Sequence, residues 1–263
     1  MALNKFIEDG QIVINQQLTH DTWEMVLEAP QIASKTRAGQ FVMVTCGKDR
    51  TDPLLRRPFS VSEVINETQI SLLYKVVGIG TELMRDMAVG QTASVIGPLG
   101  TGFKVTDANN HVLVGGGIGM APLLILSKLI KSQSDGNIIT LQGGRSSRDM
   151  LVLDRFEPYG QVLVSTDDGT QGHHGFVTEI LSGLELDNSA VYSCGPTPMM
   201  KATAAIAKEK NWPCQVSVEI EMACGMGACL GCSIPRAGEH EGVHKYLHAC
   251  KDGPVLNPGE IWA

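Results

Sequence analysis

The first hundred residues carry short runs in which apolar and polar positions partly alternate. Such alternation is typical of strands that bury one face. Gly, Pro, Asn or Asp separates the runs, at a spacing that favours an antiparallel barrel or sandwich. One helical stretch is expected in this part, over 81–88. The predicted strands cover 11–18, 22–28, 40–46, 68–76 and 91–96.

From residue 111 the pattern changes to strand, glycine turn and helix, which predicts a parallel α/β sheet. The last fifty residues differ again, because they hold five cysteines, seven glycines and little helical periodicity. We therefore expect three domains, over 1–102, 103–213 and 214–263. In the middle domain, strands are predicted over 111–114, 137–141, 161–165 and 190–193, and helices over 121–131 and 197–210.

The formal net charge of −7 is spread along the chain. Phosphate binding needs a concentrated basic surface, so this balance argues against nucleic acid as the partner. No apolar run approaches the roughly 20 residues that span a bilayer. The first residues also lack the pattern of a secretion signal. We therefore expect a soluble, cytoplasmic protein with no membrane partner.

Four cysteines near the C-terminus have a characteristic spacing. Cys224, Cys229 and Cys232 form C-x4-C-x2-C, and Cys250 follows after a longer gap. This is the plant-type ferredoxin spacing for a [2Fe–2S] cluster. Glycines between the cysteines permit positive φ and let backbone N–H groups approach the sulfur atoms. The odd total of seven cysteines also suits metal binding better than a disulfide framework.

Three other interpretations of these cysteines stay open. Structural zinc usually shows two C-x2-C knuckles, and this chain has one. Unliganded core cysteines are a second alternative, which the surrounding glycines disfavour. His240, His244 and His248 would allow Rieske-type ligation, but four thiolates are already supplied, so we interpret these histidines as part of a solvated loop.

Arg57, Pro58, Phe59 and Ser60 form a candidate flavin motif. An arginine can hold a pyrophosphate with two hydrogen bonds, a hydroxyl can reach the flavin edge, and an aromatic ring can pack on the flavin. Alone the motif is weak, and an edge strand explains the proline equally well. Two other motifs support a flavin site, Leu73-Tyr74-Lys75 and Gly80-Thr81. The second motif lies at the start of a predicted helix, where backbone N–H groups favour phosphate.

A glycine turn that follows the strand at 111–114 is a candidate nucleotide site. Gly116, Gly117 and Gly119 in this turn would let a pyrophosphate approach the helix start. No acidic residue ends the next strand. Arg145 stands there instead, either as a contact for adenosine phosphate or ribose or as a surface charge. Local chemistry therefore leaves NAD and NADP open.

Two later motifs follow strand ends, where open α/β sheets bind ligands. Asp168 is a candidate in the first, and a polar surface turn is the alternative. Cys194, Gly195 and Pro196 form the second, where small residues would let a nicotinamide approach a flavin. The alternative for Cys194 is a small buried hydrophobic residue.

Taken in order, these motifs resemble those of a known family. RRPFS, LYK, GPLGTGF, GGGIGMAPL, CGPTPMM and the four cysteines with DGPV resemble the electron-transfer subunits of NAD-linked (class B) dihydroorotate dehydrogenases. The first two-thirds also resemble the wider ferredoxin–NADP reductase superfamily. The resemblance implies an N-terminal antiparallel Greek-key β-barrel with FAD, a Rossmann-like NAD domain and a small C-terminal [2Fe–2S] domain. The three motifs around residues 57–60, 73–75 and 80–81 would contact FAD.

The family also implies a partner, an FMN-containing dihydroorotate dehydrogenase catalytic subunit in a heterotetramer of two plus two. That subunit would oxidise dihydroorotate to orotate in pyrimidine biosynthesis, and the present chain would not. Nicotinamide exchanges electrons in pairs and the cluster singly, whereas flavin does both, so FAD belongs between them. Electrons would run from the partner's FMN through the cluster and FAD to NAD⁺.

Two rival functions remain at this stage. The first is a ferredoxin–NAD(P) oxidoreductase-type subunit of another iron–sulfur flavoprotein complex, which differs in its partner. The second is a non-enzymatic binding module whose fold is stabilised by a bound zinc ion. The zinc module leaves the arginine motif and the glycine turn unexplained.

Overall fold

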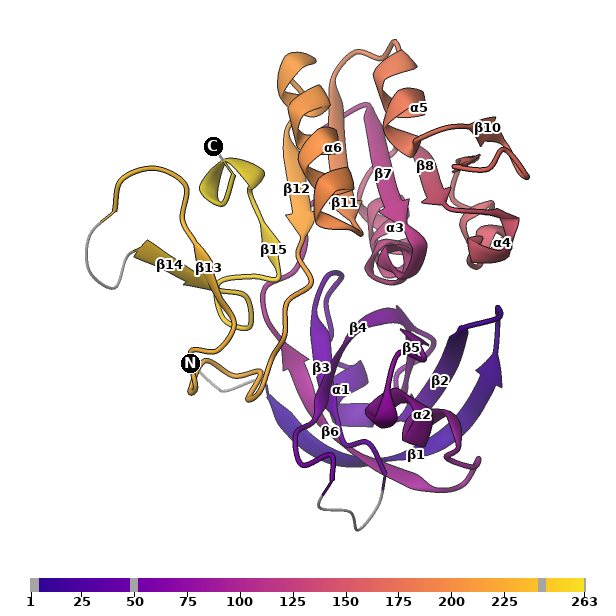
Figure 1. The fold of residues 1–263 in the computed structure, drawn as a ribbon, viewed down its shortest axis with the longest axis vertical. Helices are drawn as coiled ribbons and strands as arrows, with labels where there is room; N and C mark the ends of the chain where they lie inside the picture. Colours follow the sequence, from indigo (N-terminus) through magenta and orange to yellow (C-terminus); the bar gives the residue numbers. More distant parts are fainter. Residues whose placement is uncertain (1–4, 48–51, 241–244, 263) are drawn as a thin grey trace.

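Six antiparallel strands close a Greek-key barrel in the N-terminal part of the chain (Figure 1). The computed structural model describes residues 5–47, 52–240 and 245–262. Around the barrel the strands follow the order β1-β2-β5-β4-β3-β6. The bounds are β1 Phe6–Gln17, β2 Thr22–Glu28, β3 Phe41–Val44, β4 Arg57–Val64, β5 Gln69–Lys75 and β6 Thr92–Leu99. The predicted barrel is confirmed.

The barrel core comes from the apolar positions of the alternating pattern. Met25, Leu27, Ile70 and Leu72 have no exposed surface. Strand β1 begins at Phe6, before the predicted residue 11, because Glu8, Asp9 and Gly10 mask the strand pattern in its first half.

The strand β4 was not predicted. Strand β4 is internal in the barrel, but Pro58 lies opposite Met43 of β3 and precedes Val61, where the register with β5 begins. Pro58 therefore has a paired strand on one side, as the edge-strand alternative requires locally.

Two short helices accompany the barrel, α1 (Pro30–Ala33) and α2 (Ile79–Arg85). Helix α2 begins two residues before the predicted stretch. The Thr81 hydroxyl oxygen accepts hydrogen bonds from the backbone N–H groups of Val77 (2.9 Å) and Gly78 (3.3 Å). This side-chain cap satisfies N–H groups at the helix start, so the turn into α2 forms earlier than the apolar pattern indicates.

A second sheet of seven strands follows, in the order β10-β9-β8-β7-β11-β12-β15. All neighbours are parallel except β12 and β15. In Figure 1, helices α5 and α6 lie on the near face of this sheet. The strands are β7 Asn110–Gly116, β8 Asn137–Gly144, β9 Gln161–Thr166, β10 His173–His174, β11 Ser189–Cys194, β12 Cys214–Ser217 and β15 Val255–Leu256. The helices are η1 Gly117–Met120, α3 Ala121–Gln133, η2 Ser147–Asp149, α4 Leu153–Phe156, α5 Val177–Gly183 and α6 Thr197–Glu209.

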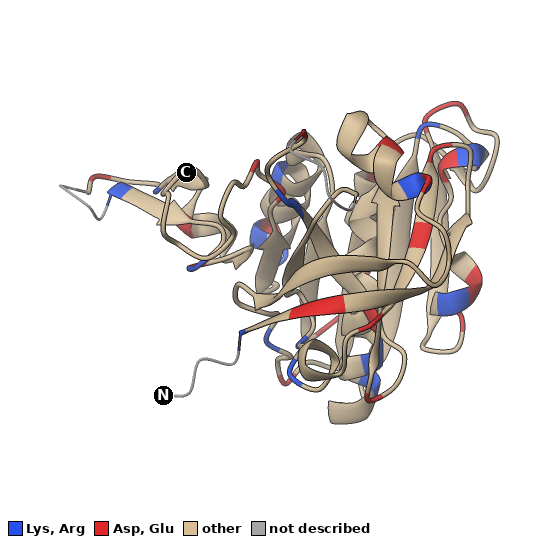
Figure 2. Ribbon diagram, turned by 90° about the horizontal axis from the view of Figure 1, so that it is seen from below, with Lys and Arg blue, Asp and Glu red and all other residues tan. Residues whose placement is uncertain are grey.

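The C-terminal residues divide between this sheet and a small projecting unit. Strands β12 and β15 extend the seven-stranded sheet although both follow residue 213. The hairpin of β13 (Ser233–Pro235) and β14 (Tyr246–His248) projects from the body of the molecule (Figures 1 and 2), and η4 (Pro258–Glu260) lies near the chain end. The three domain boundaries stay a prediction.

Contacts with the barrel hold the C-terminal unit in place. The Thr101 backbone N–H donates to the Gly253 carbonyl (2.6 Å), and the Thr101 hydroxyl donates to the Asp252 carbonyl (3.2 Å).

His248 lies in β14 rather than in a loop, and His244 lies outside the described residues. In Figure 2, acidic and basic positions are interspersed along the ribbon. No helix in the described part of the chain is long and apolar enough to cross a membrane.

Candidate functional site

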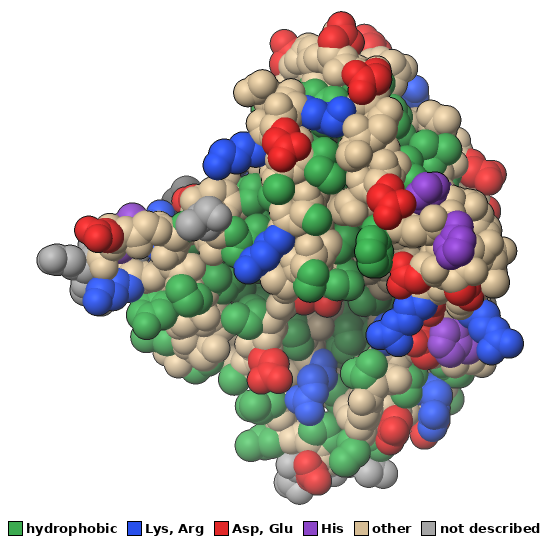
Figure 3. Space-filling model, turned by 45° about the horizontal axis from the view of Figure 1, so that its top comes forward, with side chains coloured by type: hydrophobic (Ala, Val, Ile, Leu, Met, Phe, Trp, Pro, Cys, Tyr) green, Lys and Arg blue, Asp and Glu red, His purple; other side chains and the backbone are tan. Residues whose placement is uncertain are grey.

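A cleft of about 680 Å³ opens between the barrel and the carboxyl ends of the parallel strands. Strands β7, β8, β9 and β11 end at its wall, which is where open α/β sheets bind ligands. Figure 3 shows a hollow between the two lobes, with charged and histidine side chains gathered along one rim. The cleft is therefore the candidate nucleotide site.

The glycine turn after β7 forms part of the wall. Gly116 and Gly117 line the cleft, and Gly117 has a φ of +53°. Gly119 lies behind the wall, where a Cβ atom would come within 2.2 Å of the Cys194 carbonyl oxygen. A residue without a side chain is required for so close an approach between η1 and β11.

The motif after β11 divides between the wall and the core. Gly195 and Pro196 line the cleft, next to the glycine turn. Cys194 is buried behind them, and burial raises the pKa of its thiol well above the ordinary value. A neutral buried thiol agrees with the alternative interpretation, and a contact between Cys194 and a nucleotide stays a prediction.

Asp168 lies in an exposed turn after β9. Its Oδ1 accepts hydrogen bonds from the backbone N–H (3.0 Å) and the hydroxyl (2.6 Å) of Thr170. These bonds lower the pKa of the Asp168 carboxyl. The neighbouring Asp167 lines the cleft instead. The surface-turn alternative therefore describes the geometry of Asp168, and its contact with a cofactor stays a prediction.

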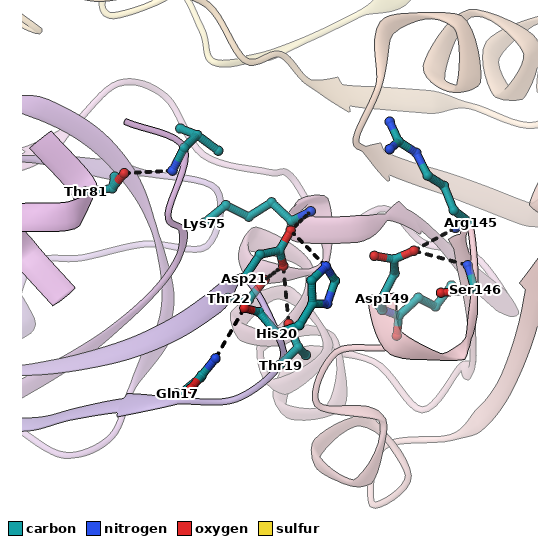
Figure 4. A network of polar contacts seen from close by, with 12 residues as sticks. Gln17, Thr19, His20, Asp21, Thr22, Lys75, Thr81, Arg145, Ser146 and Asp149 are labelled. Atoms are coloured by element: carbon teal, nitrogen blue, oxygen red, sulfur yellow. Dashed lines mark hydrogen bonds and ion pairs between the residues drawn. The ribbon is translucent and has the colours of Figure 1, made fainter. Parts of the chain in front are cut away.

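Charged residues of the barrel face the cleft from the opposite side (Figure 4). Lys75 Nζ lies 2.8 Å from Asp21 Oδ2, and His20 Nε2 lies 3.6 Å from the same oxygen. Burial acts to raise the pKa of Asp21, but hydrogen bonds from Lys75 and Thr22 outweigh it and lower that pKa. Lys75, predicted as a flavin contact, is thus held at the boundary between barrel and cleft.

The loop after β8 supplies further charges across the cleft. Arg145 lines the cleft, and its side chain extends away from the loop in Figure 4. Asp149 Oδ2 accepts hydrogen bonds from the backbone N–H groups of Arg145 (3.0 Å) and Ser146 (3.1 Å). These bonds fix the loop backbone from which the Arg145 side chain extends.

Several cleft residues were missed by the sequence analysis, among them Glu219, Ser165 and Phe176. Glu219 follows β12 and is open to the cleft, yet the protein around its carboxyl group limits hydration and raises its pKa. Ser165 lies at the end of β9, and its buried hydroxyl has no hydrogen-bond partner in the described part of the chain. Phe176 is exposed at the rim. The one available signal was position, because Ser165 and Glu219 stand at or after the carboxyl ends of strands.

The predicted flavin motif lies on β4, with the α2 turn beside it. Arg57 Nη1 donates to the Leu55 carbonyl (2.7 Å), which orients the guanidinium group. A Cβ atom at Gly80 would lie 3.2 Å from Arg57 Nε and 3.2 Å from Cys46 Sγ. The α2 turn therefore closes tightly over the arginine. Thr81 caps that turn and stays buried.

Two aromatic rings of the predicted flavin set pack against each other, one from β4 and one from β5. The ring centroids of Phe59 and Tyr74 lie 5.8 Å apart in an edge-to-face arrangement. Tyr74 is buried, which raises the pKa of its hydroxyl, and that hydroxyl donates to Asn15 Oδ1 (2.8 Å). Leu73 is buried in the barrel core, whereas Pro58 and Ser60 are half-buried. The structure thus groups the predicted flavin residues on β4, β5 and α2.

The four cysteines fall into two pairs. Cys232 Sγ and Cys250 Sγ lie 3.2 Å apart. The Cys229 backbone N–H donates to Cys224 Sγ (3.4 Å). No three His, Cys, Asp or Glu residues in the described part of the chain surround a common point as ligands of one metal ion do. Two pairs suit a cluster of two irons, each of which takes two thiolates.

Backbone N–H groups favour thiolates in this loop. Burial acts to raise the pKa of Cys224, but N–H groups of Met226, Cys229 and Ala228 outweigh it and lower that pKa to about 6. Burial and the adjacent Cys232 raise the pKa of Cys250. Gly225 and Gly227 have φ values of +69° and +87°, as a wrapping loop requires. The donor set therefore fits a cluster that is bound as thiolates.

Comparisons with known proteins agree with this geometry. Residues 219–261 match the iron–sulfur cluster binding domain of dihydroorotate dehydrogenase B, and residues 113–205 match an oxidoreductase NAD-binding domain. The dihydroorotate dehydrogenase B (NAD⁺) electron transfer subunit of Caldanaerobacter subterraneus subsp. tengcongensis is 36% identical over 96% of this chain and 97% of its own. The subunit of the same name from Fusobacterium nucleatum subsp. nucleatum is 37% identical over 97% of this chain and 98% of its own.

The fold has solved relatives as well. The structure of an NADH-dependent reduced ferredoxin–NADP oxidoreductase has a TM-score of 0.86 and 30% identity, covering 97% of this chain and 90% of that one. Barrel, nucleotide sheet and four-cysteine domain thus define an electron-transferring oxidoreductase of the ferredoxin–NADP reductase type. Within that class, the chain belongs to the family of dihydroorotate dehydrogenase B (NAD⁺) electron transfer subunits.

Proposed function

We propose that the chain relays electrons between an FMN-containing dihydroorotate dehydrogenase subunit and NAD⁺, in a cytoplasmic assembly of two plus two. FAD, a [2Fe–2S] cluster and NAD supply the redox chemistry, because flavin alone exchanges electrons both singly and in pairs. The observation that carries the proposal is that the nucleotide cleft and the cysteine pairs both border the barrel that bears the predicted flavin residues. Lys75 of the predicted flavin set lines the cleft, and Cys232 and Cys250 pack with Phe41, Met43 and Leu99 of the same barrel.

The barrel would hold FAD. Arg57 would bind the pyrophosphate, because its guanidinium is oriented and the α2 turn lies against it. The ring of Phe59 would pack beside the flavin, and Ser60 would reach its edge. The other proposed contacts are Pro58, Leu73, Tyr74, Lys75, Gly80 and Thr81.

The cleft would hold NAD. Gly116 and Gly117 leave room for the pyrophosphate, and Gly195 with Pro196 leaves room for the nicotinamide beside the barrel. The unpartnered hydroxyl of Ser165 supports a polar ligand at that wall, since buried hydroxyl groups rarely lack a partner. Gly119 and Cys194 would support the NAD site from behind the wall of the cleft, and Asp168 would contribute from the turn beside that wall.

The four cysteines would hold the cluster, with Cys224 and Cys229 on one iron and Cys232 and Cys250 on the other. The short contacts within each pair support this division. The N–H groups around Cys224 would stabilise the negative charge of the cluster and tune its potential.

The test uses the chain without its partner, purified anaerobically. We expect NADH to reduce a chemical one-electron acceptor through the chain, while dihydroorotate gives no turnover until the FMN subunit is added. Dihydroorotate oxidation by the chain alone would contradict the division of labour. A chain that binds zinc in place of iron would contradict the cluster.

A second candidate is supported by the similarity to the NADH-dependent reduced ferredoxin–NADP oxidoreductase. In that case the chain would serve a complex that exchanges electrons with ferredoxin. A reduced ferredoxin would then drive NAD(P)⁺ reduction by the purified assembly, whereas dihydroorotate would not.

A further inference from the structure

Strand β3 has two faces with different surroundings. Val42 and Val44 belong to the barrel core, as the alternation along a strand requires. Phe41 and Met43 point the other way and pack with Cys250 beneath the C-terminal unit. Phe41 is 3% exposed and Met43 is fully buried. The outer face of β3 is therefore a packed contact with the cysteine-rich domain.

Met43 touches the cysteine loop itself. A Cβ atom at Gly225 would lie 2.5 Å from Met43 Cγ and 3.2 Å from Leu99 Cδ1. Gly225 directly follows Cys224, one of the proposed cluster ligands. The loop backbone thus rests on Met43 and Leu99, which come from the neighbouring strands β3 and β6.

Of these two strands, β3 alone pairs with the flavin strand. Met43 lies opposite Pro58 on β4, and Phe41 lies opposite Ser60. Residues directly opposite on antiparallel strands share a face, and paired strands lie roughly 4.8 Å apart. In contrast, β6 pairs with β1 and β3. Side chains under the cysteine loop are therefore one strand away from residues that we propose to hold FAD.

We propose that β3, through Met43 and Phe41, is the bridge for electrons between the cluster and FAD. The inference rests on the proposed function, since it presumes both groups. Neither residue lines the nucleotide cleft. In the step concerned, one electron leaves the reduced flavin, one ferric ion of the cluster becomes ferrous, and the flavin proton passes to water. Met43 and Phe41 act as positioning residues. Their side chains fill the space between the cysteine loop and the strand pair β3–β4 with close-packed atoms.

The matched variants are Met43→Ala and Leu99→Ala. Both remove a buried side chain that supports Gly225, and both leave a cavity in the same cluster of residues. Only Met43→Ala removes atoms from the strand that is bonded to β4. Met43→Leu nearly preserves the volume and serves as the rescue variant.

The experiment mixes each oxidised holoprotein with NADH anaerobically and follows flavin and cluster absorbance separately. We expect Met43→Ala to slow cluster reduction several-fold, while flavin reduction by NADH keeps the wild-type rate. Leu99→Ala and Met43→Leu should change the ratio of the two rates less than twofold. Equal slowing in Met43→Ala and Leu99→Ala would overturn the bridge, because loosening of the domain would then explain both.

Iron content, the EPR spectrum of the reduced cluster and its reduction potential are measured on the same preparations. We expect wild-type iron content and spectrum in Met43→Ala, so that the rates are compared at a known driving force. Unchanged cluster reduction in Met43→Ala would also overturn the bridge. A wild-type chain without iron would instead contradict the proposed function, which separates the two failures.

Discussion

Arg155 of helix α4, in the lobe of the nucleotide sheet, binds Glu24 of the barrel with both terminal nitrogens of its guanidinium group. Nη1 contacts Glu24 Oε1 (2.6 Å) and Nη2 contacts Oε2 (2.8 Å). Glu24 is 3% exposed and also accepts hydrogen bonds from Ser71 and Gln16. Burial acts to raise the pKa of Glu24, but the bonds from Arg155 and Ser71 outweigh it and lower that pKa. The two lobes that border the cleft are therefore joined by an ion pair whose carboxylate is buried and whose guanidinium group is half-buried.

Glu24→Gln should destabilise the protein by about 2 kcal/mol, because it leaves the half-buried guanidinium group of Arg155 without a charged partner. Denaturant unfolding at pH 7 measures the loss. The control is Glu63→Gln, which removes the partly exposed interlobe pair with Lys128 (3.1 Å) and should cost less than about 1 kcal/mol. Equal losses in the two variants would contradict the special role of the pair between Glu24 and Arg155.

The contribution of Glu24 should also depend on pH. Its folded pKa lies below the ordinary value of 4.5, so its stabilisation is present above that value and is lost as the pH falls through the lowered pKa. The stability difference between wild type and Glu24→Gln should therefore shrink in acid. A difference that stays constant from pH 7 into the acid range would show that the ion pair does not cause it.

Glu219 should behave in the opposite way. Its raised pKa means that the folded protein prefers the protonated carboxyl, so ionisation costs stability as the pH rises above 4.5. Glu219→Gln should raise the melting temperature at pH 8 and change it little in acid. Glu221→Gln, on the same segment but outside the lining of the cleft, is the control and should change the melting temperature little. A gain in melting temperature that is the same at pH 8 and in acid would contradict the raised pKa of Glu219.

Much of this architecture follows from local pattern. The predicted helices over 121–131 and 197–210 are confirmed by α3 and α6, because both combine a continuous apolar face with a proline near the start. Strand β4 escaped prediction because arginine, proline and serine mask its alternation, and only its neighbours in a closed barrel specify it. Strands β12 and β15 are too short to show a period.

The candidate site was partly predictable for a related reason. Glycine turns and cysteine spacing are local signals, so Gly116, Gly195 and the four cysteines could be named from the sequence alone. Glu219 and Ser165 line the same cleft only because of the strand order, which no local pattern carries. Asp168 shows the reverse case, because a polar residue after a strand can satisfy its own turn instead of a ligand.

Gly119→Ala should disable the nicotinamide site. Its new methyl group would meet the Cys194 carbonyl oxygen at 2.2 Å, so η1 must move away from β11. A displacement of about 1 Å can cost about a hundredfold in rate. We expect flavin reduction by NADH to fall by about that factor, while dithionite still reduces the flavin. The control is Gly183→Ala in α5, where a Cβ atom meets no other atom within 4 Å. Equal rates of flavin reduction by NADH in the Gly119→Ala and Gly183→Ala variants would contradict the proposed role of Gly119.

Cys250→Ser should remove most of the iron and leave FAD in place, because the cysteine loop and the flavin motif lie on different elements. Colorimetric iron and extracted flavin, both per chain, measure this. Cys214→Ser is the matched control. Its thiol lies outside the cysteine motif, and burial raises its pKa to about 12, so it is a neutral core group. Iron loss in Cys214→Ser comparable to that in Cys250→Ser would contradict the ligand assignment.

The most direct test of the relay is NAD⁺ reduction by dihydroorotate in the assembled complex with the FMN subunit. It compares the wild-type chain with the Cys250→Ser chain in the same assembly. The wild-type complex should form NADH, whereas the variant complex should let dihydroorotate bleach the partner's FMN without forming NADH. Equal NADH formation by both complexes would contradict a path through the cluster.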